Sequence, residues 1–311
     1  MKALVATEYA TLDRISVTDH PTPSPGPGQV LVKVEAAALN PLDLALITGA
    51  MKDMFPVEHP LVIGMDVAGT VAKLGEGVTE YALGDPVLAF VGQGGTVAEY
   101  TVATVADRFA KRPPGLAAAQ AAAIPESGLT AMCLLRAVGL AAGESLLVVG
   151  ATGGIGLYAV QVASSLGAQV IATATAEDAE YMRSLGAAGT VDYKAADVVA
   201  ETLRLVPGGV DVVLDLVNRG EGLVGSARAA RPGGRLVSPL FGPDDLGREV
   251  SGVYIGGFTS EPGDLEKLAA RAAEGTLRVE IGASYPLADA ARAVADFAGK
   301  HIRGKVVVTV P

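Results

Sequence analysis

The chain has 311 residues, which suits about two domains of ordinary size, and half of its residues are hydrophobic, so it can bury a sizeable core. Its formal net charge of −10 argues against a nucleic-acid partner, because phosphate binding requires a basic face. Its single cysteine, Cys133, excludes an internal disulfide, and we find neither an apolar stretch of membrane-spanning length nor a signal-peptide pattern. We therefore expect a cytoplasmic protein with no nucleic-acid or membrane partner.

The first hundred residues alternate short apolar runs with clusters of Pro and Gly. The runs include ALVATEY, QVLVKVEAAAL, MDVAGTVAKLG, DPVLAFV and TVAEYTVA. Short apolar runs that are broken in this way are typical of strands. Only PLDLALITG has a helical pattern here, so we predict a mostly β region.

Residues 145–174 have the pattern of a strand, a turn, a helix and a second strand. Gly150, Gly153 and Gly156 fall at the predicted turn. The first permits a tight turn, the second leaves no side chain between the backbone and a ligand, and the third lets the helix lie close to the sheet. The N–H groups at the start of the helix would then face a phosphate, although glycine turns of this kind also occur without ligands.

Three further segments, AGTVDY, GVDVVLDLV and GGRLVSPL, each have the pattern of a strand that follows a helix. This alternation predicts an α/β fold with a doubly wound parallel sheet, which binds its ligand at the carboxyl ends of the strands. The candidate cofactor contacts at these ends are Ala151, Thr152, Gly153, Gly154, Ile155, Thr173, Thr175, Val217, Ser238 and Leu240. Two helical segments and the apolar run GKVVVTV complete the chain.

Nine segments resemble the medium-chain dehydrogenase/reductase superfamily, in family order: AAALNPLDLALITG, PLVIGMDVAGTVAKLGEGV, GDPVLAF, GTVAEY, AAAIPESGLTA, GATGGIGLYAVQVA, LGAAGTVDY, GGRLVS and GKVVV. The resemblance is to the zinc-free quinone and enone oxidoreductase branch. It implies a GroES-like β catalytic domain, residues 1–122 completed by 264–311, and a Rossmann nucleotide-binding domain, residues 123–263.

The residues that hold catalytic zinc in other members are missing. Their Gly-His-Glu is replaced by Gly-Met-Asp at residues 64–66, and we interpret the three histidines as surface or loop residues and Cys133 as a buried apolar group. Oxidation of an alcohol needs a Lewis acid or a strong base, whereas conjugate reduction produces an enolate that hydrogen-bond donors can stabilise. We therefore expect no metal, a small-molecule substrate, and hydride transfer from NADPH, with NADH as the alternative donor, to a quinone or an α,β-unsaturated carbonyl.

The resemblance assigns roles to three further residues. Asn40 matches the family asparagine near the nicotinamide ribose and the substrate carbonyl, although it could simply be a turn residue. Asp43 matches a family aspartate that is a candidate catalytic residue, but we favour a structural role in which it caps the next helix and holds the loop of Asn40. Thr130 matches a threonine near the nicotinamide, unless its hydroxyl bonds to the preceding helical turn. Arg303 is a further candidate cofactor contact.

The predicted cofactor preference depends on the end of the second strand, ATAT, which contains no acid to accept from a ribose 2′-OH. This favours NADPH, with Thr175 and the family tyrosine, Tyr193, as candidate contacts of the 2′-phosphate. Asp178 occupies the position that often holds lysine in NADPH-dependent relatives. We therefore expect a weak preference, with NADH accepted.

Two alternatives remain open, because the Tyr or Lys that several relatives carry after the NPxD motif is replaced by Ala45, Leu46 and Ile47. One is an enoyl-thioester or biosynthetic-intermediate reductase, and the other is a cofactor-binding protein without redox chemistry.

Residues 248–258 predict an apolar edge strand that pairs across a two-fold axis in a homodimer. The aromatic residues that could line the substrate pocket, or simply pack in the core, are Tyr9, Phe55, Tyr254 and Phe258.

Overall fold

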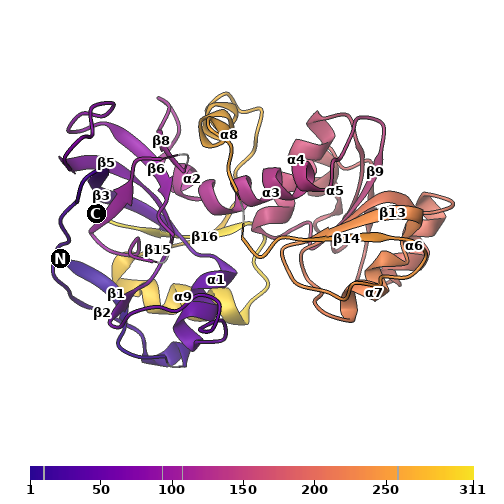
Figure 1. Ribbon diagram of the computed structural model, residues 1–311, viewed down its shortest axis with the longest axis horizontal. Helices are drawn as coiled ribbons and strands as arrows, with labels where there is room; N and C mark the ends of the chain where they lie inside the picture. Colours follow the sequence, from indigo (N-terminus) through magenta and orange to yellow (C-terminus); the bar gives the residue numbers. More distant parts are fainter. Residues whose placement is uncertain (10, 93, 107, 258) are drawn as a thin grey trace. The chain divides into compact units, whose positions relative to one another are not determined.

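The computed structural model describes residues 1–9, 11–92, 94–106, 108–257 and 259–311 (Figure 1). The chain divides into two compact units: the first unit is Met1–Glu126 with Ser260–Pro311, and the second unit is Ser127–Thr259. The sequence analysis predicts two junctions as well, but places them after residues 122 and 263. In the described residues, no helix combines the length and the apolar composition that crossing a membrane requires.

The first unit is built on two β-sheets. The larger sheet has the strand order β15-β16-β3-β5-β6-β8, with β7 also paired to β3, and the smaller sheet has the order β2-β1-β4. The strands are β1 (Lys2–Ala6), β2 (Ser16–Asp19), β3 (Gln29–Ala38), β4 (Leu61–Val62), β5 (Asp66–Leu74), β6 (Pro86–Phe90), β7 (Tyr100–Thr104), β8 (Phe109–Lys111), β15 (Ile281–Pro286) and β16 (Lys305–Thr309). The strands predicted in the first hundred residues are thus present.

Short helices accompany these sheets. They are α1 (Pro41–Thr48), α2 (Ala118–Ala122), α8 (Asp264–Ala273) and α9 (Ala290–Gly299), with 3₁₀ turns η1 (Leu12–Arg14) and η2 (Leu287–Asp289); α3 (Pro125–Ala137) crosses from the first unit into the second. The C-terminal strand β16, in yellow in Figure 1, runs antiparallel to β3, with Val307 opposite Ala38. In this register, the start of β16 lies beside the residues that follow β3.

The second unit contains a parallel sheet with the order β11-β10-β9-β12-β13-β14, as predicted for a doubly wound fold. Its elements are β9 (Ser145–Val149), α4 (Gly154–Ser165), β10 (Gln169–Thr173), α5 (Ala179–Ser184), β11 (Gly189–Val191), α6 (Val198–Leu205), β12 (Val210–Asp215), α7 (Gly222–Ala227), β13 (Ala230–Ser238) and β14 (Ser251–Tyr254). The chain builds outward from β9 to β11 and then returns to the other side of β9. The strand order therefore reverses between β9 and β12, where doubly wound sheets bind their ligands.

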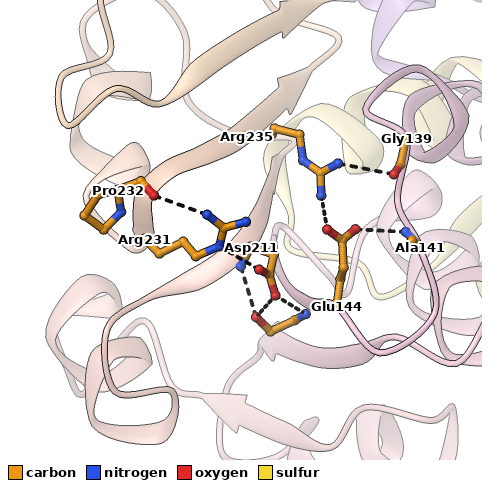
Figure 2. A network of polar contacts seen from close by, with 8 residues as sticks. Gly139, Ala141, Glu144, Asp211, Arg231, Pro232 and Arg235 are labelled. Carbon is orange, nitrogen blue, oxygen red and sulfur yellow. Dashed lines mark hydrogen bonds and ion pairs between the residues drawn. The ribbon is translucent and has the colours of Figure 1, made fainter.

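Polar contacts link neighbouring strands at the amino-terminal edge of this sheet (Figure 2). Asp211 accepts hydrogen bonds from the Ser145 N–H and hydroxyl, both at 2.8 Å, and pairs with Arg231 at 2.7 Å. Next to it, Arg235 pairs with Glu144, and the same carboxylate accepts the Ala141 N–H at 2.9 Å. These contacts join the starts of β9, β12 and β13, so this edge has a structural role.

The edge strand is shorter than predicted. Only Ser251–Tyr254 forms β14, which pairs with β13 on one side. Arg248 and Glu249 have positive φ angles of 54° and 59°, so the chain turns before the strand begins. Phe258, the last residue of the predicted strand, lies outside the described residues.

Candidate functional site

The glycine turn between β9 and α4 has the geometry that the sequence predicts. Gly150 adopts a φ of +85°, which side chains rarely tolerate. A Cβ on Gly156 would lie 2.3 Å from the carbonyl oxygen of Gly150, so this position permits no side chain without displacing the backbone. The backbone of the glycine turn therefore packs directly against the backbone of the first helical turn of α4.

The start of α4 is open to a ligand. Gly153 is the N-cap, and no side chain caps the helix. Residues 153–155 are half-buried, whereas Ala151 and Thr152 are buried beneath them. Free N–H groups and the positive end of the helix dipole suit a pyrophosphate here.

Apolar side chains are exposed next to this turn and along the same edge. Tyr193, Val217 and Phe241 follow β11, β12 and β13, and they are 40%, 58% and 53% exposed. Exposed large apolar groups that gather at the carboxyl ends of a parallel sheet are suited to contact a planar ligand. Val217 lies at the reversal of strand order, beside Gly150: its Cγ2 would be 2.7 Å from a Cβ on that glycine.

The hydroxyl groups of two other predicted contacts are used within the protein. Thr173 accepts the Gly150 N–H at 2.9 Å, and Ser238 accepts the Leu240 N–H at 3.0 Å. Both residues are almost fully buried. They shape the turns that follow the strands, and Leu240 is half-buried in one of these turns.

Thr130, on α3, differs from these two residues. Its hydroxyl is buried and has no hydrogen-bond partner, so it does not bond back to the preceding helical turn. Buried hydroxyl groups are usually satisfied, so an orphaned one is suited to a hydrogen bond with a ligand group. This observation fits the predicted contact with a nicotinamide cofactor.

Two carboxyl groups lie at the predicted ribose end of the nucleotide site. The Thr175 hydroxyl donates to Asp178 at 3.3 Å, and Asp178 is buried. Asp192, which the sequence analysis did not single out, accepts the Ala176 N–H at 3.2 Å. Its position directly before Tyr193 is the signal that could have identified it.

In the first unit, Asn40 belongs to a fully buried polar cluster. Its amide nitrogen donates to Asp66 at 3.0 Å, and the ammonium group of Lys305 donates to its amide oxygen. An ammonium can only donate and a carboxylate can only accept, so these two partners fix the orientation of the amide. The Lys305 nitrogen is also 3.4 Å from Asp66, whose other oxygen accepts the Glu126 N–H at 2.9 Å.

Asp43 adds a second carboxyl group to this cluster. Its Oδ2 accepts the Asn40 N–H at 2.7 Å, as predicted for a helix cap that holds this loop, while its Oδ1 is buried without a partner. Burial raises the pKa of Asp43 to about 7, helped by the nearby Asp66 and opposed by the Asn40 N–H and Lys305. Burial likewise raises the pKa of Asp66 to about 6 against the charge of Lys305.

Arg303 lies near the start of β16, in the first unit. Its guanidinium donates to Glu280 at 2.9 and 3.1 Å. This side chain is therefore already paired to a carboxylate. A role in cofactor binding stays a prediction.

Family models match both parts of the chain. The description "Alcohol dehydrogenase GroES-like domain" matches residues 26–114, and "Zinc-binding dehydrogenase" matches residues 185–308. The fold is accordingly a GroES-like β domain with a Rossmann domain.

Curated relatives and solved structures agree with these matches. A chloroplast envelope quinone oxidoreductase homolog from Arabidopsis thaliana is 32% identical, covering 96% of this chain and 94% of that protein. A quinone oxidoreductase from Pseudomonas aeruginosa is also 32% identical, with 96% and 97% covered. A 39% identical match to a chloroplastic quinone oxidoreductase of Triphysaria versicolor spans 58% of this chain and 57% of that protein. The quinone oxidoreductase structure from Coxiella burnetii superposes with a TM-score of 0.88 at 29% identity, covering 100% of this chain and 99% of that one.

The residues of the first unit do not fit a zinc ion, despite the wording of the matching description. Asp66 is engaged by an amide, a backbone N–H and the Lys305 ammonium, whose positive charge would repel a second cation. Met65 is buried where zinc relatives carry histidine, and Cys133 is buried in the second unit, with its Sγ 3.9 Å from the Thr259 hydroxyl. Among the described residues, no group of three or more His, Cys, Asp and Glu is arranged to hold a metal.

Proposed function

Because the chain belongs to the quinone oxidoreductase branch of the medium-chain dehydrogenase/reductase superfamily and is an oxidoreductase, we propose that it transfers hydride from NADPH to a quinone or an α,β-unsaturated carbonyl. The carboxyl edge of the parallel sheet carries this proposal. There, an uncapped helix start and a glycine turn meet an exposed apolar side chain where the strand order reverses. This combination suits a dinucleotide.

Asn40 is the proposed donor to the substrate oxygen. NADPH supplies hydride to the conjugated system, and negative charge then develops on the carbonyl oxygen. Asn40 uses one amide hydrogen for Asp66, which leaves one for that oxygen. The ammonium of Lys305 on the amide oxygen polarises the amide and makes its N–H a stronger donor.

Substitution Asn40→Ala tests this role. We expect kcat/KM for an enone to fall by about 30-fold, on the order of 2 kcal/mol, because a lost oxyanion donor costs that much or more. The KM for NADPH should change little. Asn40 has no exposed surface, so the competing interpretation is a purely structural turn residue. A folded variant with unchanged turnover would establish that interpretation.

The reaction is tested directly by NADPH consumption with quinones, enones and enoyl thioesters. We expect quinones or enones to be reduced, with activity retained in a chelator, because the residues around Asp66 do not fit zinc. Preferential turnover of enoyl thioesters would favour the alternative reductase. About one tightly bound zinc per chain by elemental analysis would contradict the zinc-free chemistry.

We propose NADPH as the preferred cofactor, with NADH accepted. A 33% identical relative from Arabidopsis thaliana is named an NADPH-dependent alkenal/one oxidoreductase, and a 31% identical mycobacterial structure contains NADPH. The proposed contacts of the 2′-phosphate are the exposed Tyr193 and Thr175, whose hydroxyl would turn from Asp178 to the phosphate when the nucleotide binds. The neighbouring Asp178 weakens the preference by charge repulsion.

Substitution Asp178→Lys should therefore tighten NADPH binding and leave NADH binding nearly unchanged. The gain should shrink at high salt, because screening reduces the attraction to the phosphate. Asp178→Asn, which removes the negative charge without adding a positive one, should give a smaller gain. Calorimetric titration with both nucleotides measures these effects. Unchanged affinity in both variants would show that the 2′-phosphate binds elsewhere.

A further inference from the structure

Asp215 is a fully buried carboxyl group at the carboxyl end of β12, and the reaction proposed above gives it no task. Its Oδ1 accepts the backbone N–H groups of Val217 and Asn218, both at 2.9 Å. Its Oδ2 accepts the side-chain amide of Asn218 at 2.8 Å and the hydroxyl of Ser226. Burying a carboxyl group is costly unless its oxygens are satisfied, and four donors satisfy them here.

These donors hold the loop of residues 216–218 against the glycine turn. Leu216 continues the contact of β12 with β9 by donating to the Val149 carbonyl at 3.1 Å. The next side chain, Val217, then lies beside Gly150, where a Cβ would be 2.7 Å from Val217 Cγ2. Val217 is 58% exposed all the same, so part of its side chain remains accessible next to the glycine turn.

We propose that Asp215 is a positioning residue for the nucleotide. By fixing the backbone of Val217 and Asn218, it presents the Val217 side chain as an apolar wall beside the turn that receives the pyrophosphate. This inference rests on the proposed function, because it assumes that a nicotinamide nucleotide binds at this edge.

Asp211 supplies a matched control on the same strand. It also accepts a backbone N–H and a serine hydroxyl, but it does so at the amino-terminal edge of the sheet (Figure 2). A carboxyl group that only stabilises the sheet should behave alike at either edge. If Asp215 instead positions the nucleotide, its replacement should weaken nucleotide binding, whereas replacement of Asp211 should not.

The test measures the dissociation constants of NADPH and NADH by calorimetry. Asp215→Asn should weaken binding by about tenfold, the effect expected from losing one hydrogen bond to a charged group. Val217→Ala should also weaken it. Because Asp215 acts through Val217, the double variant should bind no more weakly than Asp215→Asn alone. Asp211→Asn should lower the thermal midpoint and keep the wild-type dissociation constants.

Two milder variants cover the case in which Asp215→Asn does not fold. Asn218→Ala and Ser226→Ala each remove one donor to Oδ2 and should weaken binding by about threefold. Wild-type affinity in the folded variants would overturn the proposal, as would equal weakening by Asp211→Asn or additive effects in the double variant. If the wild-type protein binds neither nucleotide, the proposed function fails as well. Binding by the wild type with no change in the variants overturns the role of Asp215 alone.

Discussion

Asp43 and Asp66 are buried together with one cation, Lys305, so the cluster can neutralise only one of the two carboxylates. Burial raises the pKa of Asp43 to about 7 and that of Asp66 to about 6. Both carboxyl groups therefore hold their protons more tightly in the folded protein than in the unfolded chain, where an aspartate titrates near pH 4. Their contribution to stability is complete below about pH 4 and is lost as the pH rises through about 6 to 7.

Substitution Asp43→Asn should flatten this pH dependence. The amide mimics the neutral acid, so the variant should lose less free energy of unfolding than the wild type between about pH 4 and pH 7. Denaturant unfolding across this range measures the difference. Asp53→Asn, at an exposed position of the same unit, should leave the slope unchanged. Parallel curves for Asp43→Asn and the wild type would show that Asp43 is ionised throughout.

The sequence predicts some members of this cluster and not others. Asn40 and Asp43 were identified because they stand in one short motif, and the helix cap between them is local. Lys305 was missed because it is 265 residues from Asn40 along the chain. A signal was present, however, because Lys305 directly precedes the apolar run VVVTV in a strand that proves to be buried. A buried lysine requires an acid or another acceptor, and only the fold shows which one.

Individual elements were predictable where one pattern extends over a whole strand or helix. The parallel strands β9, β10 and β12 consist mostly of buried apolar residues, so their existence follows from composition. The strand order does not follow from any single run, and it required the rule for doubly wound folds. The edge strand β14 was predicted too long, because positive φ angles at Arg248 and Glu249 cannot be inferred from those residue types.

The amino-terminal edge of the parallel sheet should be sensitive to acid. Partial burial opposes ionisation of Asp211, but the Ser145 N–H, the Arg231 guanidinium and the Ser145 hydroxyl outweigh it and lower its pKa to about 2. A lowered pKa stabilises the folded state above about pH 4, and this contribution is lost as the pH falls through about 2. Asp211→Asn should therefore lower the thermal midpoint near neutral pH and much less below about pH 3. An equal loss at both pH values would show that shape, not charge, stabilises this edge.

For the whole molecule, we predict a two-fold symmetric dimer built on β14. This strand ends the sheet and pairs with β13, and no strand in the described residues pairs with its other side. The unpaired backbone N–H and C=O groups of an edge strand can bond to a second strand. A symmetric pairing of two copies would satisfy these groups on both edges at once. Ser251→Lys places like charges on the two facing edges, so it should shift the protein to monomer at micromolar concentration. Leu166→Lys, at the exposed apolar residue that caps the end of α4, should leave the dimer intact. Light scattering measures both variants. A monomeric wild type would overturn the dimer, and a dimer that Leu166→Lys disrupts and Ser251→Lys does not would place the interface away from β14.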